Sequence, residues 1–238
     1  LRCVYYPINR FKYRQYEHAL EHGSATDIFT RIYEGKLWRG GKSVSGSGST
    51  LESTERLRQS LPEVFRTFSI RSLFDAPCGE FSWMERVVSG SGIQYLGADI
   101  VPALVAKNRE RCRSSNVKFV IANICTDPFP KADLWFCRDC LFHLSYKDIY
   151  LALERFMESD IPLILTTTHI NDTKFENSDI RTGRYRRIDL FAEPFQLSED
   201  VKFRIPDWVS PAAPREMCLW TRKQIVPVLP KMKQKVGL

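Results

Sequence analysis

From residue 71 onward, short apolar segments alternate with segments of helical pattern, and this alternation constrains the fold more than any other feature of the chain. The apolar segments are rich in β-branched and aromatic residues, which is typical of strands that are buried on both faces. Strands that alternate with helices form a mostly parallel sheet covered by helices on both sides. We therefore predict strands at 71–75, 94–98, 117–121, 133–137 and 162–167, with two further strand candidates at 201–205 and 217–221.

Helices are predicted between these strands and in the N-terminal part of the chain. Thr26 and Asp27 are available to cap the second N-terminal helix, and Ser49 or Thr50 to cap the third. Pro62 is expected to restart a helix at a first-turn position. The predicted helices span 10–20, 26–33, 51–60, 62–68, 80–88, 102–112 and 146–157.

Composition excludes some classes of protein and leaves others open. The 238 residues, 43% of them hydrophobic, suffice for a sizeable core, and no apolar run approaches the roughly 20 residues of a membrane span. The net charge of +7 is compatible with a basic surface or with an anionic partner. The seven cysteines are scattered, and the close pair Cys137 and Cys140 lacks a second pair, so we expect a reducing, cytoplasmic location and assign no metal.

The turn after the first predicted strand is a candidate ligand-binding site. Asp75 ends the strand, and Gly79 allows the backbone to bend and to approach a ligand closely. In such sheets, ligands bind outside the carboxyl ends of the strands. Pro77 removes an N–H donor and the three glycines of a pyrophosphate-binding loop are missing, which argues against a dinucleotide.

The ends of the next two strands carry groups that suit a nucleoside. Asp99 can accept hydrogen bonds from ribose hydroxyls, and Asn123 beside Ile124 suits the edge and the face of an adenine. A cofactor with one ribose, an amino-acid tail and no phosphate fits this set. The residues favour S-adenosylmethionine.

The sequence resembles the class I S-adenosylmethionine-dependent methyltransferases over roughly residues 30 to 222. Phe74–Gly79 is similar to the first motif of that family, and Gly97–Ile100 to the second. A less characterised subgroup, which often occurs beside sugar-modifying and glycan-assembly functions, is similar in four further segments: Trp38–Gly41, Ser45–Ser49, Cys137–Ser145 and Thr166–Thr168.

The resemblance implies an α/β, Rossmann-like fold with a central, mostly parallel seven-stranded sheet. Residues 51–238 would form the cofactor-binding domain, and residues 1–50 an N-terminal helical extension with a Ser/Gly-rich loop that is either a flexible linker or a lid. Trp83 and Trp38 either belong to the core or wall the cofactor cleft. The residues expected to hold S-adenosylmethionine, and its product S-adenosylhomocysteine, are Asp75, Ala76, Pro77, Gly79, Trp83, Asp99, Ile100, Asn123, Ile124, Arg138, Trp38 and Ser47.

The candidate catalytic residues follow the fourth strand. His143 is our first choice as general base, because a histidine titrates near neutrality; its alternative role is helix packing. Asp139 could orient His143, act as the base, hold the substrate or cap a helix. His169 ends the fifth strand, and Arg184 and Arg186 belong to a late basic segment that would either clamp an anionic acceptor or form a solvated face. These three are the expected substrate-binding residues.

We expect an O-directed methyltransferase with a sugar, glycan or other small-molecule acceptor. Two alternatives stay open at this point. The basic charge would suit an RNA methyltransferase, and a chain that binds the cofactor without turnover would be a scaffold or an activating subunit.

Overall fold

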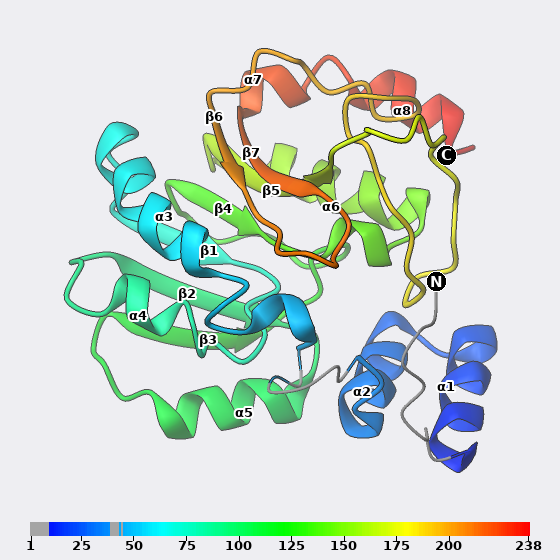
Figure 1. Ribbon diagram of the computed structural model, residues 1–238, viewed down its shortest axis with the longest axis horizontal. Helices are drawn as coiled ribbons and strands as arrows, with labels where there is room; N and C mark the ends of the chain where they lie inside the picture. Colours follow the sequence, from blue (N-terminus) through cyan, green and yellow to red (C-terminus); the bar gives the residue numbers. More distant parts are fainter. Residues whose placement is uncertain (1–9, 39–42, 44) are drawn as a thin grey trace.

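A central β-sheet organises the structure, a computed structural model that describes residues 10–38, 43 and 45–238 (Figure 1). Within these residues the sheet has seven strands in the order β3-β2-β1-β4-β5-β7-β6. Only β7 runs in the direction opposite to the other strands, which confirms the predicted mostly parallel Rossmann-like sheet. The strands are β1 (Ser72–Asp75), β2 (Gln94–Asp99), β3 (Val117–Ile121), β4 (Leu134–Cys137), β5 (Leu163–His169), β6 (Phe203–Pro206) and β7 (Arg215–Thr221).

Helices cover both faces of this sheet because the strands alternate the direction of their apolar side chains. Leu134 and Phe136 of β4 pack on one face, and Trp135 and Cys137 on the other. The first face is covered by α3 (Glu55–Thr67), α4 (Glu85–Val88) and α5 (Pro102–Arg111). The second face is covered by α6 (Tyr146–Glu158), α7 (Arg222–Ile225) and α8 (Leu229–Lys235). None of the helices in the described ranges is long and apolar enough to cross a membrane.

The sheet changes its direction of growth between β1 and β4. From β1 the sheet continues through β2 to β3 on one side. On the other side it continues through β4, β5 and β7 to β6. Asp75, at the end of β1, is level with Gly97 of β2 and Phe136 of β4. A crevice outside the carboxyl ends of the strands is expected at such a switch point.

The helix boundaries differ from the predictions at several places. The helix expected from residue 51, with Ser49 or Thr50 as its cap, begins only at Glu55. The helix expected from residue 80 begins only at Glu85, because Gly79 and Phe81 adopt left-handed backbone conformations that a helix cannot contain. Pro62 lies on the exposed side of one continuous helix, α3, and does not start a new one. Ser24 caps α2 (Ala25–Gly35), and Asp27 completes the capping box with it.

The N-terminal extension is a helical hairpin that packs on a late loop. Helix α1 (Arg10–His22) and α2 bury Leu20 and Ile28 between them. The hydroxyl of Tyr16 donates to the carbonyl of Gly183 at 3.0 Å. Arg184 forms an ion pair with Glu17 at 2.8 Å. The extension is therefore held in place by residues 183–184.

We expect Gly183→Ala to detach this hairpin. Gly183 has φ of 95°, and an added Cβ would clash with the side chain of Ile28. The substitution should make α1 and α2 sensitive to limited proteolysis, with a destabilisation of about 1–3 kcal/mol. Gly90→Ala is the matched control, because Gly90 also has positive φ while its Cβ would meet no atom. Equal protease sensitivity of the two variants would contradict the expected docking.

Candidate active site

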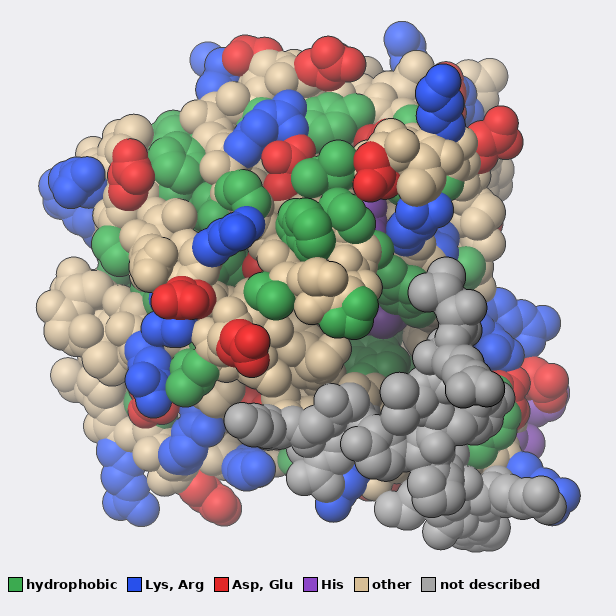
Figure 2. Space-filling view, viewed as in Figure 1, with side chains coloured by type: hydrophobic (Ala, Val, Ile, Leu, Met, Phe, Trp, Pro, Cys, Tyr) green, Lys and Arg blue, Asp and Glu red, His purple; other side chains and the backbone are tan. Residues whose placement is uncertain are grey.

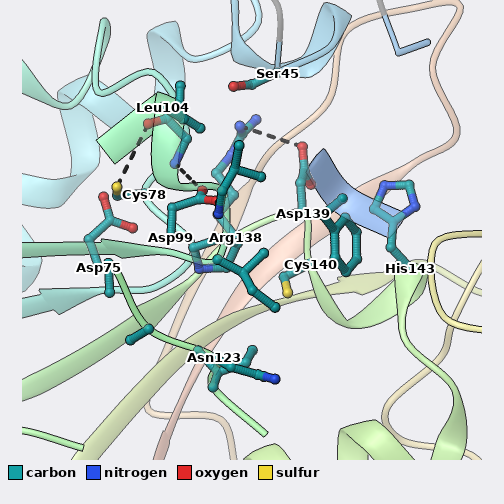
Figure 3. Close-up of a pocket in the computed structure, with 18 of the residues that line it drawn as sticks. Ser45, Asp75, Cys78, Asp99, Leu104, Asn123, Arg138, Asp139, Cys140 and His143 are labelled. Carbon is teal, nitrogen blue, oxygen red and sulfur yellow. Dashed lines mark hydrogen bonds and ion pairs between the residues drawn. The ribbon is translucent and has the colours of Figure 1, made fainter. Parts of the chain in front are cut away.

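A cavity of about 230 Å³ lies at the carboxyl ends of the strands on both sides of the switch point. Figure 3 shows Asp75 and His143 at its two sides, with Asp99, Arg138 and Asp139 between them. The cavity thus collects side chains from the turn after β1, the ends of β2, β3 and β4, and helix α2. The predicted site residues that line it are Trp38, Asp75, Pro77, Gly79, Trp83, Asp99, Ile100, Asn123, Ile124, Arg138, Asp139 and His143.

The turn after β1 is fixed by contacts with three other segments. Gly79, with φ of 53°, donates its N–H to Asp99 at 3.2 Å and accepts from the side-chain amide of Asn108 in α5 at 2.7 Å. An added Cβ at Gly79 would lie 3.0 Å from the hydroxyl oxygen of Ser45. Because only glycine leaves this space, the Ser/Gly-rich loop can lie directly against the turn.

Asp75 is a buried carboxyl group at the edge of the cavity. Its side chain is 2% exposed, and the hydroxyl of Tyr95 donates to it at 2.6 Å. Burial raises the pKa of Asp75 to about 8. The group is therefore mostly neutral at pH 7 until a positive charge is placed beside it.

Asp99 ends β2 and holds two backbone amides. Val101 donates to one of its oxygens at 3.0 Å and Gly79 to the other at 3.2 Å. Burial raises its pKa to about 6, so the carboxylate is ionised at neutral pH. A carboxylate has about four acceptor sites, and two of them stay available for hydroxyl groups of a ligand.

Asn123 fixes the turn after β3, which forms part of the cavity lining. Its side-chain oxygen accepts from the N–H of Cys125 at 2.9 Å, and its own N–H donates to Asp127 at 3.0 Å. These bonds fix the turn that presents Ile124 to the cavity, where Ile100 and Leu104 also line the wall. The result is an apolar slot that suits a flat ring.

Four charged residues form a buried ion network beside the cavity: Arg138, Asp139, Asp207 and Arg215. Arg138 donates to both oxygens of Asp207, at 2.7 and 3.0 Å. Arg215 donates to both oxygens of Asp139, at 3.0 Å each. Arg138 lies 3.4 Å from Asp139, which joins the two pairs. Bidentate geometry of this kind is the strong and specific form of an ion pair.

The same network holds the Ser/Gly-rich loop and the turn that precedes α4. Arg138 donates to the carbonyl of Gly48 at 2.9 Å, and its guanidinium lies over the ring of Trp83 at 5.4 Å. A Cβ on Gly48 would lie 2.8 Å from Asp139. On the other side of the loop, Ser43 donates to Glu80 at 2.6 Å. Residues 39–42 and 44 of this loop lie outside the described residues.

Asp139 is bound as a counter-ion. Burial acts to raise its pKa, but Arg138 and Arg215 outweigh that effect, and the pKa is lowered. Its N–H also donates to the hydroxyl of Thr167 at 2.9 Å. A carboxylate that two guanidinium groups hold ionised is a poor proton acceptor, so this arrangement favours His143 over Asp139 as the base.

His143 belongs to the short helix η2 (Leu141–His143). Its Nδ1 lies 2.9 Å from the carbonyl oxygen of Arg184. Since a carbonyl only accepts, Nδ1 carries the proton and Nε2 is left with its lone pair. Burial lowers the pKa of His143 to about 4, so the ring is neutral at pH 7. Trp38 stacks on this ring, with centroids 4.3 Å apart.

Two of the predicted cofactor-binding residues and all three predicted substrate-binding residues lie outside the cavity lining. Ala76 is fully buried, and its carbonyl accepts from Trp135. The carbonyl of Ser47 accepts from Ser53, while Ser45 and Ser49 line the cavity instead. His169 lines a separate hollow with Asp189 and Glu216.

The two arginines predicted to clamp an acceptor have other partners. Arg186 is buried and donates to the carbonyls of Phe142 and Leu144, at 3.3 and 2.7 Å. Arg184 pairs with Glu17 of α1 through its side chain and with His143 through its carbonyl. The basic segment therefore supports η2 and the extension from outside the cavity.

Several residues that matter to this site were not singled out from the sequence. Tyr95 lies in the middle of a predicted strand, and the apolar face of α2 reads as ordinary helix packing. Asp207 and Arg215 follow and precede the two late strand candidates, and charged residues at those ends were the available signal. The missed lining residues include Phe29, Ile32 and Tyr33 of α2.

Comparison with known proteins identifies the central part of the chain. A family model described as a methyltransferase domain matches residues 74–158, from β1 to the end of α6. Over these residues the chain is similar to methyltransferase domains. No curated protein sequence matches the chain.

Solved structures of methyltransferases share the fold of the described residues. A structure of human N-acetylserotonin methyltransferase in complex with SAM has a TM-score of 0.54 at 18% identity, and the alignment covers 90% of this chain and 64% of that one. For magnesium protoporphyrin IX methyltransferase from Synechocystis PCC 6803 with bound SAH, the TM-score is 0.59 at 10% identity, with 83% and 97% covered. The mitomycin 7-O-methyltransferase aligns at 0.51 and 15% identity, with 90% and 68% covered. The domain match and this fold both agree with S-adenosylmethionine, the cofactor indicated by the sequence.

We expect Arg138→Met to destabilise the protein strongly. The substitution leaves Asp207, which is 1% exposed at its side chain, buried without its partner, and such a loss costs about 3–5 kcal/mol. Arg155→Met is the control, because Arg155 pairs with Glu158 at the surface, where a pair contributes about 0–1 kcal/mol. Urea unfolding of both variants measures the difference. Similar free energies of unfolding would show that the network does not stabilise the fold.

Proposed function

We propose that the protein is an S-adenosylmethionine-dependent methyltransferase that methylates a hydroxyl group of a small molecule, with His143 as general base. The observation that carries this proposal is the position of the His143 ring together with its protonation state and tautomer. Its ring lines the same cavity as Asp75 and Asp99 and is neutral, and Nε2 has no hydrogen-bond partner among the described residues. A neutral imidazole in that state can take a proton from an acceptor hydroxyl.

The residues around the cavity fit the cofactor. The slot formed by Ile100, Leu104 and Ile124 would take the adenine, and the two free acceptor sites of Asp99 the ribose hydroxyls. Asp75 would face the ammonium group of the methionine part. Its buried carboxyl would then ionise, because an adjacent positive charge favours the charged form.

The bound cofactor supplies a methyl group that is already activated on a sulfonium. The protein then has to align the acceptor oxygen with that methyl group and to receive the hydroxyl proton. Arg184 fixes the tautomer of His143 through its carbonyl, and Trp38 fixes the plane of the ring. The Ser/Gly-rich loop, which Gly48 ties to Arg138, would cover the methionine part and exclude water.

The acceptor class is open to a narrower proposal. The resemblance of the sequence suggests a sugar or glycan hydroxyl. The proteins of similar fold are named for varied acceptors, among them N-acetylserotonin and a 7-hydroxyl position of mitomycin. A small-molecule oxygen acceptor is common to the expected sugar or glycan substrate and to the name of the mitomycin 7-O-methyltransferase.

Binding of S-adenosylhomocysteine should release about one proton at pH 7. The pKa of Asp75 is raised to about 8, so the group is protonated in the free protein and ionises when the ammonium group arrives. Calorimetry in buffers of different ionisation enthalpy measures the release. It should decline above pH 8, where Asp75 is already ionised, and vanish in Asp75→Asn. Asp200→Asn is the control, because Asp200 is exposed and does not line the cavity. Unchanged release in Asp75→Asn would refute the assignment.

His143→Gln should lower kcat about 10²- to 10⁴-fold and leave the Kd of S-adenosylhomocysteine unchanged, because the base acts on the acceptor only. A radiolabelled methyl-transfer assay and calorimetry separate the two effects. His18→Gln, on the exposed side of α1, should retain full activity. A fully active His143→Gln protein would remove His143 from the mechanism.

A further inference from the structure

Four apolar or aromatic side chains form one wall of the cavity. Phe29, Ile32 and Tyr33 belong to α2, and Trp38 follows this helix. Phe29 meets Trp38 edge-on with centroids 5.9 Å apart, and Trp38 stacks on His143 at an interplanar angle of 22°. The rings of Phe29, Tyr33 and Trp38 are partly exposed. An acceptor ring placed on this wall would therefore lie next to the base.

The charges of the described lining residues disfavour an anionic acceptor. Among the described lining residues Arg138 is the only lysine or arginine, and its guanidinium is already bound by Asp207, Asp139 and the carbonyl of Gly48. Five acidic residues line the cavity: Asp75, Glu80, Asp99, Asp139 and Asp148. A carboxylate or phosphate on the acceptor would meet negative charge, and none of the lining residues that the structure describes offers it a free cation.

The distribution of charged side chains on the outer surface agrees with that in the cavity. Figure 2 shows hydrophobic side chains along the hollow in the middle of this face, while lysine and arginine side chains are scattered over the face and its rim. Arg184 and Arg186, which a clamp for an anion would require, are held by Glu17 and by the carbonyls of Phe142 and Leu144. The recognition surface for the acceptor is apolar and aromatic.

We propose that the acceptor is an uncharged aromatic compound with a phenolic hydroxyl, whose ring packs on Phe29, Tyr33 and Trp38 and whose hydroxyl faces His143. This proposal rests on the proposed methyltransferase function and narrows its acceptor. The phenolic oxygen bonds to the methyl carbon as the bond from that carbon to the cofactor sulfur breaks. The sulfur keeps the electron pair of the broken bond, and the hydroxyl proton passes to Nε2 of His143.

The weak basicity of His143 also favours a phenolic hydroxyl over a sugar hydroxyl as the proton donor. The imidazole of His143, with its pKa lowered to about 4, is a weak base. A phenolic hydroxyl has a pKa of about 10, and a sugar hydroxyl is a much weaker acid. Proton transfer to a weak base is less unfavourable from the phenol.

A matched acceptor panel tests the proposal on the full chain with methyl-labelled S-adenosylmethionine. The probes are 2-naphthol, 6-hydroxy-2-naphthoate and methyl glucoside. The first is an uncharged phenol, the second adds a carboxylate to the same ring system, and the third is a sugar without an aromatic ring. We expect turnover of 2-naphthol, at least a tenfold lower kcat/KM for the carboxylate and no turnover of the glucoside. Preference for the carboxylate overturns the inference that anions are disfavoured, and turnover of the glucoside alone overturns the aromatic acceptor.

The wall is tested by exchanging one ring. Phe29→Leu should raise the KM for 2-naphthol about tenfold and leave the Kd of S-adenosylhomocysteine unchanged. Phe68→Leu is the matched control, because Phe68 is also partly buried but packs on Phe203 outside the cavity. An unchanged KM in Phe29→Leu refutes the wall as the acceptor surface.

The outcomes separate the two proposals. Binding of S-adenosylhomocysteine without turnover of 2-naphthol refutes the phenolic acceptor and leaves the cofactor site in place. Failure to bind S-adenosylhomocysteine refutes the proposed function itself.

Discussion

The ion network of Arg138, Asp139, Asp207 and Arg215 is the interaction on which the arrangement of the site depends. Arg138 and Asp139 follow β4, Asp207 follows β6 and Arg215 begins β7, so the network ties β4 to the two strands at the far edge of its half of the sheet. Buried charges are stable only when their partners are present with good geometry, and here each arginine meets a carboxylate with two hydrogen bonds. Through Gly48 the network also fixes the loop over the cofactor turn.

Burial tunes the titratable groups of the cavity in different directions. Asp75 and Asp99 have raised pKa values because their charged forms lose water, whereas Asp139 stays ionised between two arginines. His143 is kept neutral by the same loss of water, and a backbone carbonyl determines which nitrogen holds its proton. One cavity therefore contains a neutral acid, an ionised acceptor, a counter-ion and a neutral base, and their differences arise from their surroundings.

The sequence predicts the sheet well because each strand is a short apolar segment, and the residues at the strand ends can be read from the chain. Asp75, Asp99, Asn123 and His143 all line the cavity as expected. The ion network could not be read in this way, since Arg138 and Asp207 are 69 positions apart and Asp139 and Arg215 are 76 apart. The partners of Arg184 and Arg186 were hidden for the same reason: in a sequence, an arginine that supports a loop looks the same as one that binds a ligand.

The helical hairpin of α1 and α2 has a consequence for how such a protein can diversify. The hairpin contributes Phe29, Ile32 and Tyr33 to the cavity, and its anchors to the rest of the chain include Tyr16 and Glu17. The groups that suit the cofactor are on the sheet, in a separate stretch of sequence. Substitutions on the inner side of α2 can therefore remodel the acceptor surface without altering the cofactor turn. The two recognition tasks are free to evolve independently.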